Sequence, residues 1–222
     1  MLSDFAIVAS IIIGYFISIS LVTTTFYKSR ANNFLSLSLF LLASQMLLEW
    51  HGPENKFLSF LYFINFDLVI GVILFTYFLI QIQYQPFKRS WYKWLYVPIV
   101  FSVVAEAIFH LDTIFHLYES NFAEIVVYIK DNVSLGLNLF LIIWGRILIK
   151  KAQAISDNKK RWLLRFNLFL LLFMLSWLFA RIESHVFDSE YAFYIPGIII
   201  AVLSWWILYY GIFRLQIVVQ KD

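Results

Sequence analysis

The sequence contains no cysteine among its 222 residues, which excludes disulfides, thiolate metal ligands and a cysteine nucleophile. Charged residues are also scarce, at 14% of the chain, against about 25% in an average soluble domain. The residues from Met1 to Asp4 lack the basic region and cleavage site of a signal peptide, so the apolar run that follows is expected to remain as a helix. Hydrophobic residues instead make up 62% of the chain, and the mean hydropathy is +0.78. This composition predicts a membrane protein with several spans.

Seven apolar runs are long enough to cross a bilayer, which takes about 17–25 residues. They cover residues 5–27, 34–51, 58–83, 94–111, 122–149, 163–183 and 192–214. The connections between them are short, so consecutive helices are expected to be antiparallel neighbours. The sequence therefore predicts an all-α bundle of seven transmembrane helices over residues 1–214. Residues 215–222 are expected to begin a cytoplasmic signalling helix, cut off before an output domain, and the last helix is expected to continue from Ile195 through Val219.

The basic residues are distributed unevenly between the two sides of the predicted bundle. Those in the connections after the first, third and fifth runs and in the C-terminal tail are Lys28, Arg30, Lys88, Arg89, Lys93, Lys150, Lys151, Lys159, Lys160, Arg161 and Lys221. The other side has only Lys56 and Arg181. The positive-inside rule then predicts an outer N-terminus and a cytoplasmic C-terminus, with the basic side facing anionic lipid.

Tryptophan and tyrosine cluster at the ends of the predicted spans, as at Trp50, Trp162 and Tyr210. Their amphipathic rings suit the headgroup region, so most are expected at the interface and not in a ligand cage. Pro98 and Pro196 fall in the first turns of two spans, where they are expected to start helices.

The fifth run, Phe122 to Ile149, is apolar enough to span a membrane and yet carries several polar residues. Glu124, Asp131 and Asn138 are spaced seven residues apart, which keeps them within one stripe of a helix that should face protein. Lys130 points about 100° away from Asp131 around the axis, so its partner is expected on a neighbouring helix.

Ionisable residues converge on the predicted outer half of the bundle, where each buried charge costs free energy and needs a partner or a wet cavity. We expect a polar pocket that opens to the outside and binds a ligand or an ion. Its candidate ligand-binding residues are Glu49, Asp67, Glu106, His110, Glu124, Lys130, Asp131 and Arg181. The alternative is that these groups form internal ion pairs, such as Lys130 with Asp67 or Asp131, and Arg181 with Glu49.

No metal centre or cofactor is predicted. The four histidines form no HExxH motif and no repeated His-x-x-x-His spacing. A retinal protein would need a lysine in its last span, and residues 192–213 contain none.

Four stretches carry a resemblance to a known group of proteins: NNFLSLSLFLLASQMLLE (32–49), YQPFKRSWYKWLYVPIVF (84–101), DNKKRWLLRFNLFLLLFMLSWL (157–178) and WWILYYGIFRLQ (205–216). In these stretches the chain resembles the N-terminal seven-helix sensor region of bacterial membrane-tethered regulators, whose outputs are AraC-type, LytTR-type or histidine-kinase domains. The resemblance implies that the bundle reads an extracytoplasmic stimulus and passes it down the seventh helix.

The sequence thus favours a non-enzymatic, receptor-like sensor in a bacterial inner membrane. Its expected partners are membrane lipids, an extracytoplasmic small molecule or ion, and a second copy through the C-terminal helix, with no direct contact to nucleic acid in this region. Two alternatives remain open. One is an intramembrane enzyme that acts on a lipid or another amphiphile with Glu106, His110 and Asp131 as acid and base groups, and the other is a small transporter.

Overall fold

The computed structural model describes residues 2–27, 29–51, 66–84, 90–115, 122–187 and 194–214, and it leaves some side chains within these ranges undescribed. These residues form helices and no strand. The α-helices are α1 (Leu2–Thr23), α2 (Arg30–His51), α4 (Phe66–Gln81), α5 (Val97–Phe115), α6 (Phe122–Lys151), α7 (Asp157–Phe187) and α8 (Tyr194–Trp206). Two 3-10 helices, η1 (Thr25–Tyr27) and η5 (Ser90–Tyr96), and a π-helix, η7 (Ile207–Arg214), complete the described chain. The all-α prediction is confirmed.

Four described segments are long and apolar enough to cross a membrane: Arg30–Leu48, Tyr92–Phe109, Tyr128–Lys151 and Asp157–Ser184. Shorter apolar segments lie in α1, α4 and α8. Part of the third predicted span, residues 58–65, lies outside the described residues, and so does the predicted signalling segment 215–222. The lengths and the composition of these helices support a membrane protein.

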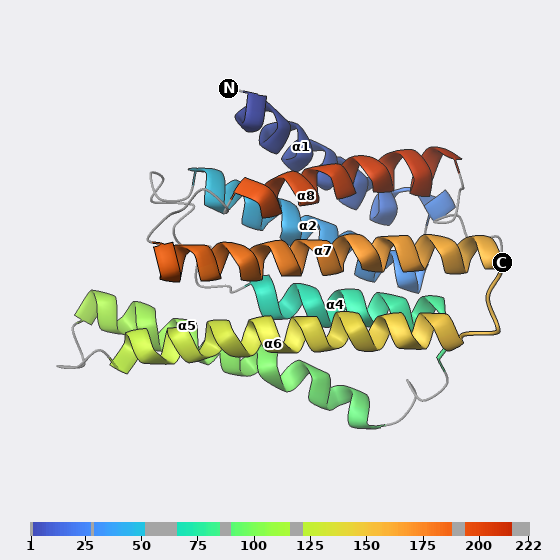
Figure 1. Cartoon of the computed structure of the whole chain (residues 1–222). Coiled ribbons are helices and arrows are strands. Elements are labelled where there is room, and N and C mark those ends of the chain that lie inside the picture. The colour runs from blue at the N-terminus through green and yellow to red at the C-terminus, as the bar shows by residue number, and fades with distance from the viewer. Residues whose placement is uncertain are drawn as a thin grey trace.

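The helices run side by side, with α1 and α8 at one side of the bundle and α5 at the other (Figure 1). Six of them form a closed ring in which α1 contacts α2, α2 contacts α4, α4 contacts α6, α6 contacts α7, α7 contacts α8, and α8 returns to α1. Helix α5 lies outside this ring and packs mainly against α6. Consecutive helices are therefore neighbours as predicted, except that α4 packs closely against α6 and makes few contacts with α5.

Helix α4 is the central helix of the bundle, with buried side chains around its whole circumference. Val72, Phe75 and Leu79 pack towards Leu141 of α6, while Tyr77 on another face joins the main core. Since lipid tails are as apolar as leucine, van der Waals packing holds such helices together more than exclusion from water does.

Small and hydroxyl side chains bring α1 and α2 together. A Cβ atom at Gly14 would lie 3.0 Å from the Cβ of Ala43, so the two helices approach closely at this point. One turn along, Ser18 and Ser36 donate hydrogen bonds to each other's backbone carbonyls at 2.9 and 2.8 Å. Both features are typical of helix pairs in membranes.

Aromatic rings join α4, α7 and α8 near the start of α7. Trp162 is buried, lies edge-on to Tyr77 and stacks on Trp206, with 5.7 Å between the centroids of the two tryptophans. Neighbouring helices therefore cover the ring of Trp162, and the expectation that it lies at headgroup depth stays a prediction. Pro98 and Pro196 do lie in the first turns of α5 and α8, as predicted.

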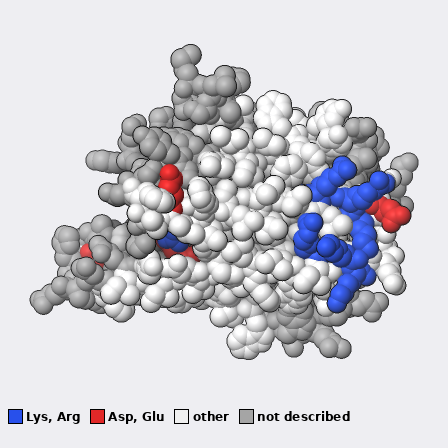
Figure 2. All heavy atoms as spheres, in the orientation of Figure 1, with Lys and Arg blue, Asp and Glu red and all other residues white. Residues whose placement is uncertain are grey.

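Charge separates along the bundle. Lysine and arginine gather at the end where α6 leads into α7, and at this end Figure 2 shows a single small acidic group beside them. The opposite end holds the ion pairs described next.

Candidate functional site

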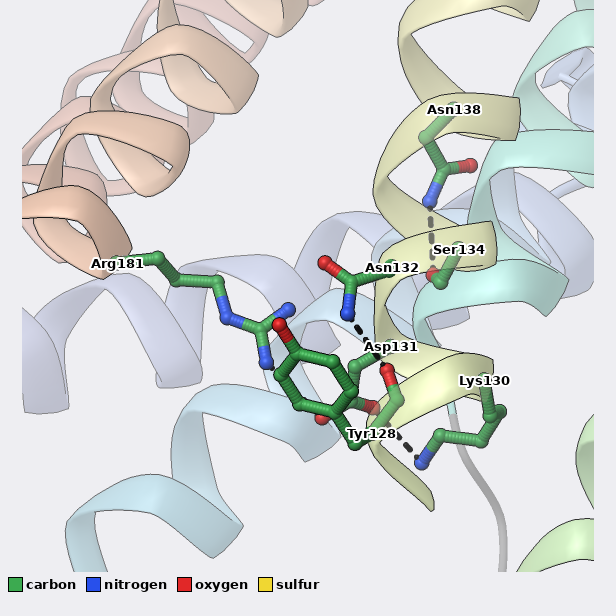
Figure 3. Close-up of polar contacts among 7 residues, drawn as sticks. All are labelled: Tyr128, Lys130, Asp131, Asn132, Ser134, Asn138 and Arg181. Atoms are coloured by element: carbon green, nitrogen blue, oxygen red, sulfur yellow. Dashed lines mark hydrogen bonds and ion pairs between the residues drawn. The ribbon is translucent and has the colours of Figure 1, made fainter. Parts of the chain in front are cut away.

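Three charged side chains meet near the start of α6 and the end of α7, and Figure 3 shows Arg181 reaching across to α6. Lys130 Nζ lies 3.0 Å from Asp131 Oδ1, and Arg181 Nη2 lies 3.3 Å from Asp131 Oδ2. The side chain of Lys130 is only 3% exposed, and those of Asp131 and Arg181 are 27% and 28% exposed. One carboxylate is thus shared by two cations and links two helices. We refer to these three residues as the ion cluster.

Lys130 has an ion-pair partner in the next residue on its own helix, whereas the expectation of a partner on a neighbouring helix stays a prediction, since the side chain of Asp67 lies outside the described residues. Although the two Cα–Cβ directions diverge by about 100°, the four-carbon stem of lysine is long enough to bend its ammonium group back to the carboxylate. Arg181 pairs with Asp131 and so reaches α6. Internal ion pairs, the alternative considered for these charges, therefore do form in this part of the bundle.

Arg181 has donor capacity that the described residues do not use. Its Nη1 atom is buried and has no hydrogen-bond partner among them. Its guanidinium group lies over the ring of Trp177, one turn earlier on α7, with 5.2 Å between Cζ and the ring centroid. The ring holds the guanidinium by a cation–π contact, which leaves Nη1 able to donate to an added oxygen acceptor.

The polar stripe of α6 continues inward from the ion cluster. Ser134 and Asn138 are buried, and Asn138 Nδ2 donates to Ser134 Oγ at 3.4 Å (Figure 3). Asn138 rests against Gly71 of α4, where a Cβ atom would lie 1.6 Å from Asn138 Oδ1. The prediction that this stripe faces protein is confirmed at Asp131, which faces Arg181 of α7, and at Asn138.

The other predicted site residues are only partly visible. Their backbones lie in the described helices α2, α4, α5 and α6, but their side chains lie outside the described part of the structure; they are Glu49, Asp67, Glu106, His110 and Glu124. Of the eight candidates, the structure brings Lys130, Asp131 and Arg181 together. Among the described side chains, no three His, Cys, Asp or Glu residues are grouped so that they could hold a metal ion.

A second polar contact between α6 and α7 was missed by the sequence reasoning, which gave neither Arg146 nor Asn167 a role. Asn167 is buried, and its Nδ2 donates to the carbonyl of Ile142 at 2.9 Å. Arg146 Nη1 donates to the carbonyl of Leu164 at 3.1 Å and to Asn167 Oδ1 at 3.5 Å. An asparagine inside the leucine-rich run RFNLFLLL was the available signal. Helices α6 and α7 are thus linked by polar contacts near both ends.

A third buried polar group joins α4 to the segment before α5. Thr76 Oγ1 lies 2.7 Å from Tyr92 Oη and 3.3 Å from Tyr96 Oη, and the two phenol groups also contact each other. The threonine hydroxyl donates to the carbonyl of Val72 as well. Each hydroxyl thereby has a partner, which supports a structural role for this group.

Comparison of the chain with protein-family models, with curated proteins and with solved structures finds no match.

Proposed function

We propose that this chain is a receptor-like sensor of a bacterial inner membrane, with its N-terminus outside and its C-terminus in the cytoplasm. An extracytoplasmic ligand or ion acts at the ion cluster, and α8 carries the response to the cytoplasmic side. The positive-inside distribution of lysine and arginine supports this orientation, because the basic end of the bundle becomes cytoplasmic.

Two observations carry the proposal. Asp131 forms ion pairs with both Lys130 and Arg181. Arg181 Nη1 is buried and has no hydrogen-bond partner among the described residues. Ionisable groups inside a membrane are costly and mark functional sites by default. Unused buried donors are rare in folded proteins and call for a ligand, an ion or water. A ligand oxygen that binds Nη1 would compete with Asp131 for the guanidinium group and weaken the link between α6 and α7.

The depth of the cluster supports an extracytoplasmic ligand. Arg161 and Arg181 are twenty residues apart on α7, which spans about 30 Å at roughly 1.5 Å per residue. This length matches the hydrocarbon thickness of a bilayer, about 30 Å. With the basic end at the cytoplasmic surface, the ion cluster lies near the outer surface and within reach of solutes there.

Contacts between α7 and α8 provide a route for the response. Trp206 of α8 stacks on Trp162 and lies 5.3 Å from Phe169, centroid to centroid, so α7 and α8 share an aromatic interface. A shift of α7 after release from Asp131 would move α8 with it. Such coupling requires an element with two arrangements that both ends influence.

A spin-label distance measurement tests this proposal. The chain lacks cysteine, so labels attach only at introduced ones, and Ile147→Cys on α6 and Val202→Cys on α8 provide exposed positions. We expect Asp131→Asn to shift the distance distribution between the two labels, because it removes the carboxylate shared by Lys130 and Arg181. Asn132→Ala is the matched control, since Asn132 is exposed and, among the described residues, bonds only to the Tyr128 carbonyl of its own helix.

An unchanged distance distribution in Asp131→Asn would mean that the ion cluster only stabilises the bundle, and it would refute the sensor proposal. A shift in both variants would also count against it, since any change near this end of α6 would then move α8. No described contact favours the enzyme or the transporter, because the side chains of Glu106 and His110 lie outside the described residues.

A further inference from the structure

A group of cations surrounds the connection between α6 and α7, and we call it the basic turn. It comprises Arg146, Lys150, Lys151, Lys159, Lys160, Arg161 and Arg165. Residues 146–165 contain these seven cations and one acid, Asp157, so their net charge is +6. Lysine and arginine form a continuous patch at this end of the molecule (Figure 2).

Helix ends account for some of these cations. Lys150 and Lys151 occupy the last turn of α6, where positive charge is favourable next to unpaired carbonyl groups. Lys160 Nζ donates to the carbonyl of Ala152 at 3.0 Å and satisfies a carbonyl at this helix end. These residues have a structural role in the fold.

Lys159 and Arg161 have no such role, because they lie among the first five residues of α7, at the positive end of the helix dipole. Lys159 is partly buried, and Arg161 Nη2 donates at 2.6 Å to the neutral side chain of Asn158. Within the described residues no carboxylate forms an ion pair with either of them, Asp157 included. An anion at this position would remove the repulsion between the cations and the helix end.

The basic turn is held in place by its neighbours. Ala152 and Ile155 pack against the main core, and Trp162 is buried immediately after Arg161. Ser156 caps α7, because its Oγ accepts from the backbone N–H of Lys159 at 3.4 Å. The cations therefore project from a backbone that is anchored before any ligand binds.

Exposed apolar side chains continue from these cations along both helices. On α7, Leu168 and Leu172 are 41% and 45% exposed and follow Arg161 and Arg165 on the same face, at spacings of three and four residues. On α6, Ile143 and Ile147 lead towards Lys150 in the same way. A polar end next to two apolar stripes fits an amphiphile with a negative headgroup.

We propose that the basic turn binds the phosphate headgroup of an anionic phospholipid at the membrane surface, with the acyl chains along the exposed stripes of α6 and α7. This site does not depend on the sensor function and lies at the opposite end of α6 and α7 from the ion cluster. Each cation near an anionic lipid surface contributes about fivefold in affinity, so Lys159 and Arg161 together contribute about 25-fold, and a loss of at least about tenfold is expected when both are removed.

The test compares two variants that remove the same charges from two connections that the sequence predicts on the same side of the bundle. Lys159→Gln/Arg161→Gln changes the start of α7 and leaves the Lys160 bond to Ala152 intact. Lys88→Gln/Arg89→Gln removes one lysine and one arginine from the segment after α4, outside the described residues. The full chain is placed in mixed micelles with phosphatidylglycerol and phosphatidylcholine, and native mass spectrometry counts the lipids that it retains.

We expect the unchanged chain and the Lys88/Arg89 variant to retain phosphatidylglycerol over phosphatidylcholine, and the Lys159/Arg161 variant to lose at least about tenfold in apparent affinity. In phosphatidylcholine alone, the melting temperature of the Lys159/Arg161 variant should be equal or higher, because two cations leave the positive end of α7. A lower melting temperature there would show a structural role for these two residues and overturn the proposal.

Equal losses of phosphatidylglycerol affinity in both variants would show that only the net charge of the chain matters, and they would overturn the proposal. Undiminished lipid binding by the Lys159/Arg161 variant would overturn it as well. A third arm adds inorganic phosphate without anionic lipid. Stabilisation of the unchanged chain, but not of the Lys159/Arg161 variant, by phosphate alone would assign the site to a soluble anion and not to a lipid.

Discussion

Asn138 on α6 occupies the position that a side chain at Gly71 on α4 would need: a Cβ atom there would lie 1.6 Å from Asn138 Oδ1. Any larger residue at position 71 would therefore force the Asn138 side chain to move. This contact fixes the distance between α4 and α6 a short way inward from the ion cluster.

We expect Gly71→Ala to destabilise the bundle by about 1–3 kcal/mol, the usual cost of overpacking a tightly packed site. Gly136→Ala is the matched control, since nothing lies within 4 Å of its added Cβ and alanine favours the helix by up to about 1 kcal/mol. Denaturant unfolding in detergent micelles measures both. Recovery of stability in Gly71→Ala/Asn138→Ala would identify the clash as the cause, and equal behaviour of the two single variants would contradict it.

Asp131→Asn removes the carboxylate that Lys130 and Arg181 share. Breaking a buried ion pair by removing one partner costs about 3–5 kcal/mol, and the partial exposure of Asp131 and Arg181 places the expected loss near the lower end. Lys130→Met/Asp131→Asn should recover part of this loss, because the lysine is then no longer left near a neutral amide. Denaturant unfolding measures these losses. If the loss in the double variant equals the sum of the losses in Lys130→Met and Asp131→Asn, the two charges act independently.

Asn167→Leu should destabilise the pairing of α6 and α7, since it removes the bond to the Ile142 carbonyl and the acceptor for Arg146. Hydrogen bonds between membrane helices contribute on average about 0.6 kcal/mol each, so a loss of about 1–2 kcal/mol is expected. Asn158→Leu serves as the control on the same helix, because Asn158 is exposed near the start of α7 and the bond that it accepts from Arg161 is exposed and lies within α7. A neutral Asn167→Leu would mean that the leucine side chain compensates fully for the lost bonds.

Fusions test the orientation. A reporter that is active only in the cytoplasm should be active after Asp222 and silent when inserted within 112–121, because the basic residues favour the first side as cytoplasmic. The opposite pattern would reverse the bundle and move the ion cluster to the cytoplasmic surface, out of reach of an extracytoplasmic ligand.

The sequence predicted the helices well because apolar length and seven-residue spacing are local properties. The same spacing correctly placed Asp131 and Asn138 on a protein-facing stripe. It did not reveal which helix each stripe meets, so the contact of Asn138 with Gly71 and the role of Asn167 remained hidden. The packing of Trp162 against α4 and α8 remained hidden for the same reason, because residue type does not show which helices cover a ring.

The last helix also differs from the expectation. It was predicted to continue from Ile195 through Val219, but the α-helix ends at Trp206 and a π-helix follows to Arg214, with residues 215–222 outside the described part. The spacing of hydrophobic residues in so short a stretch does not distinguish a π-helix from an α-helix. A π-helical stretch is rare and occurs often at functional sites, which agrees with a role for this end of α8 in passing on a response.

The ring of helices closes through contacts between α1 and α8, the first and last α-helices that the structure describes. During synthesis, α1 and α2 are able to join early through Ser18 and Ser36, since both emerge together. The side of α1 that faces α8 has no partner until α8 has been synthesised. The long sequence separation between α1 and α8 therefore makes ring closure a late step of folding.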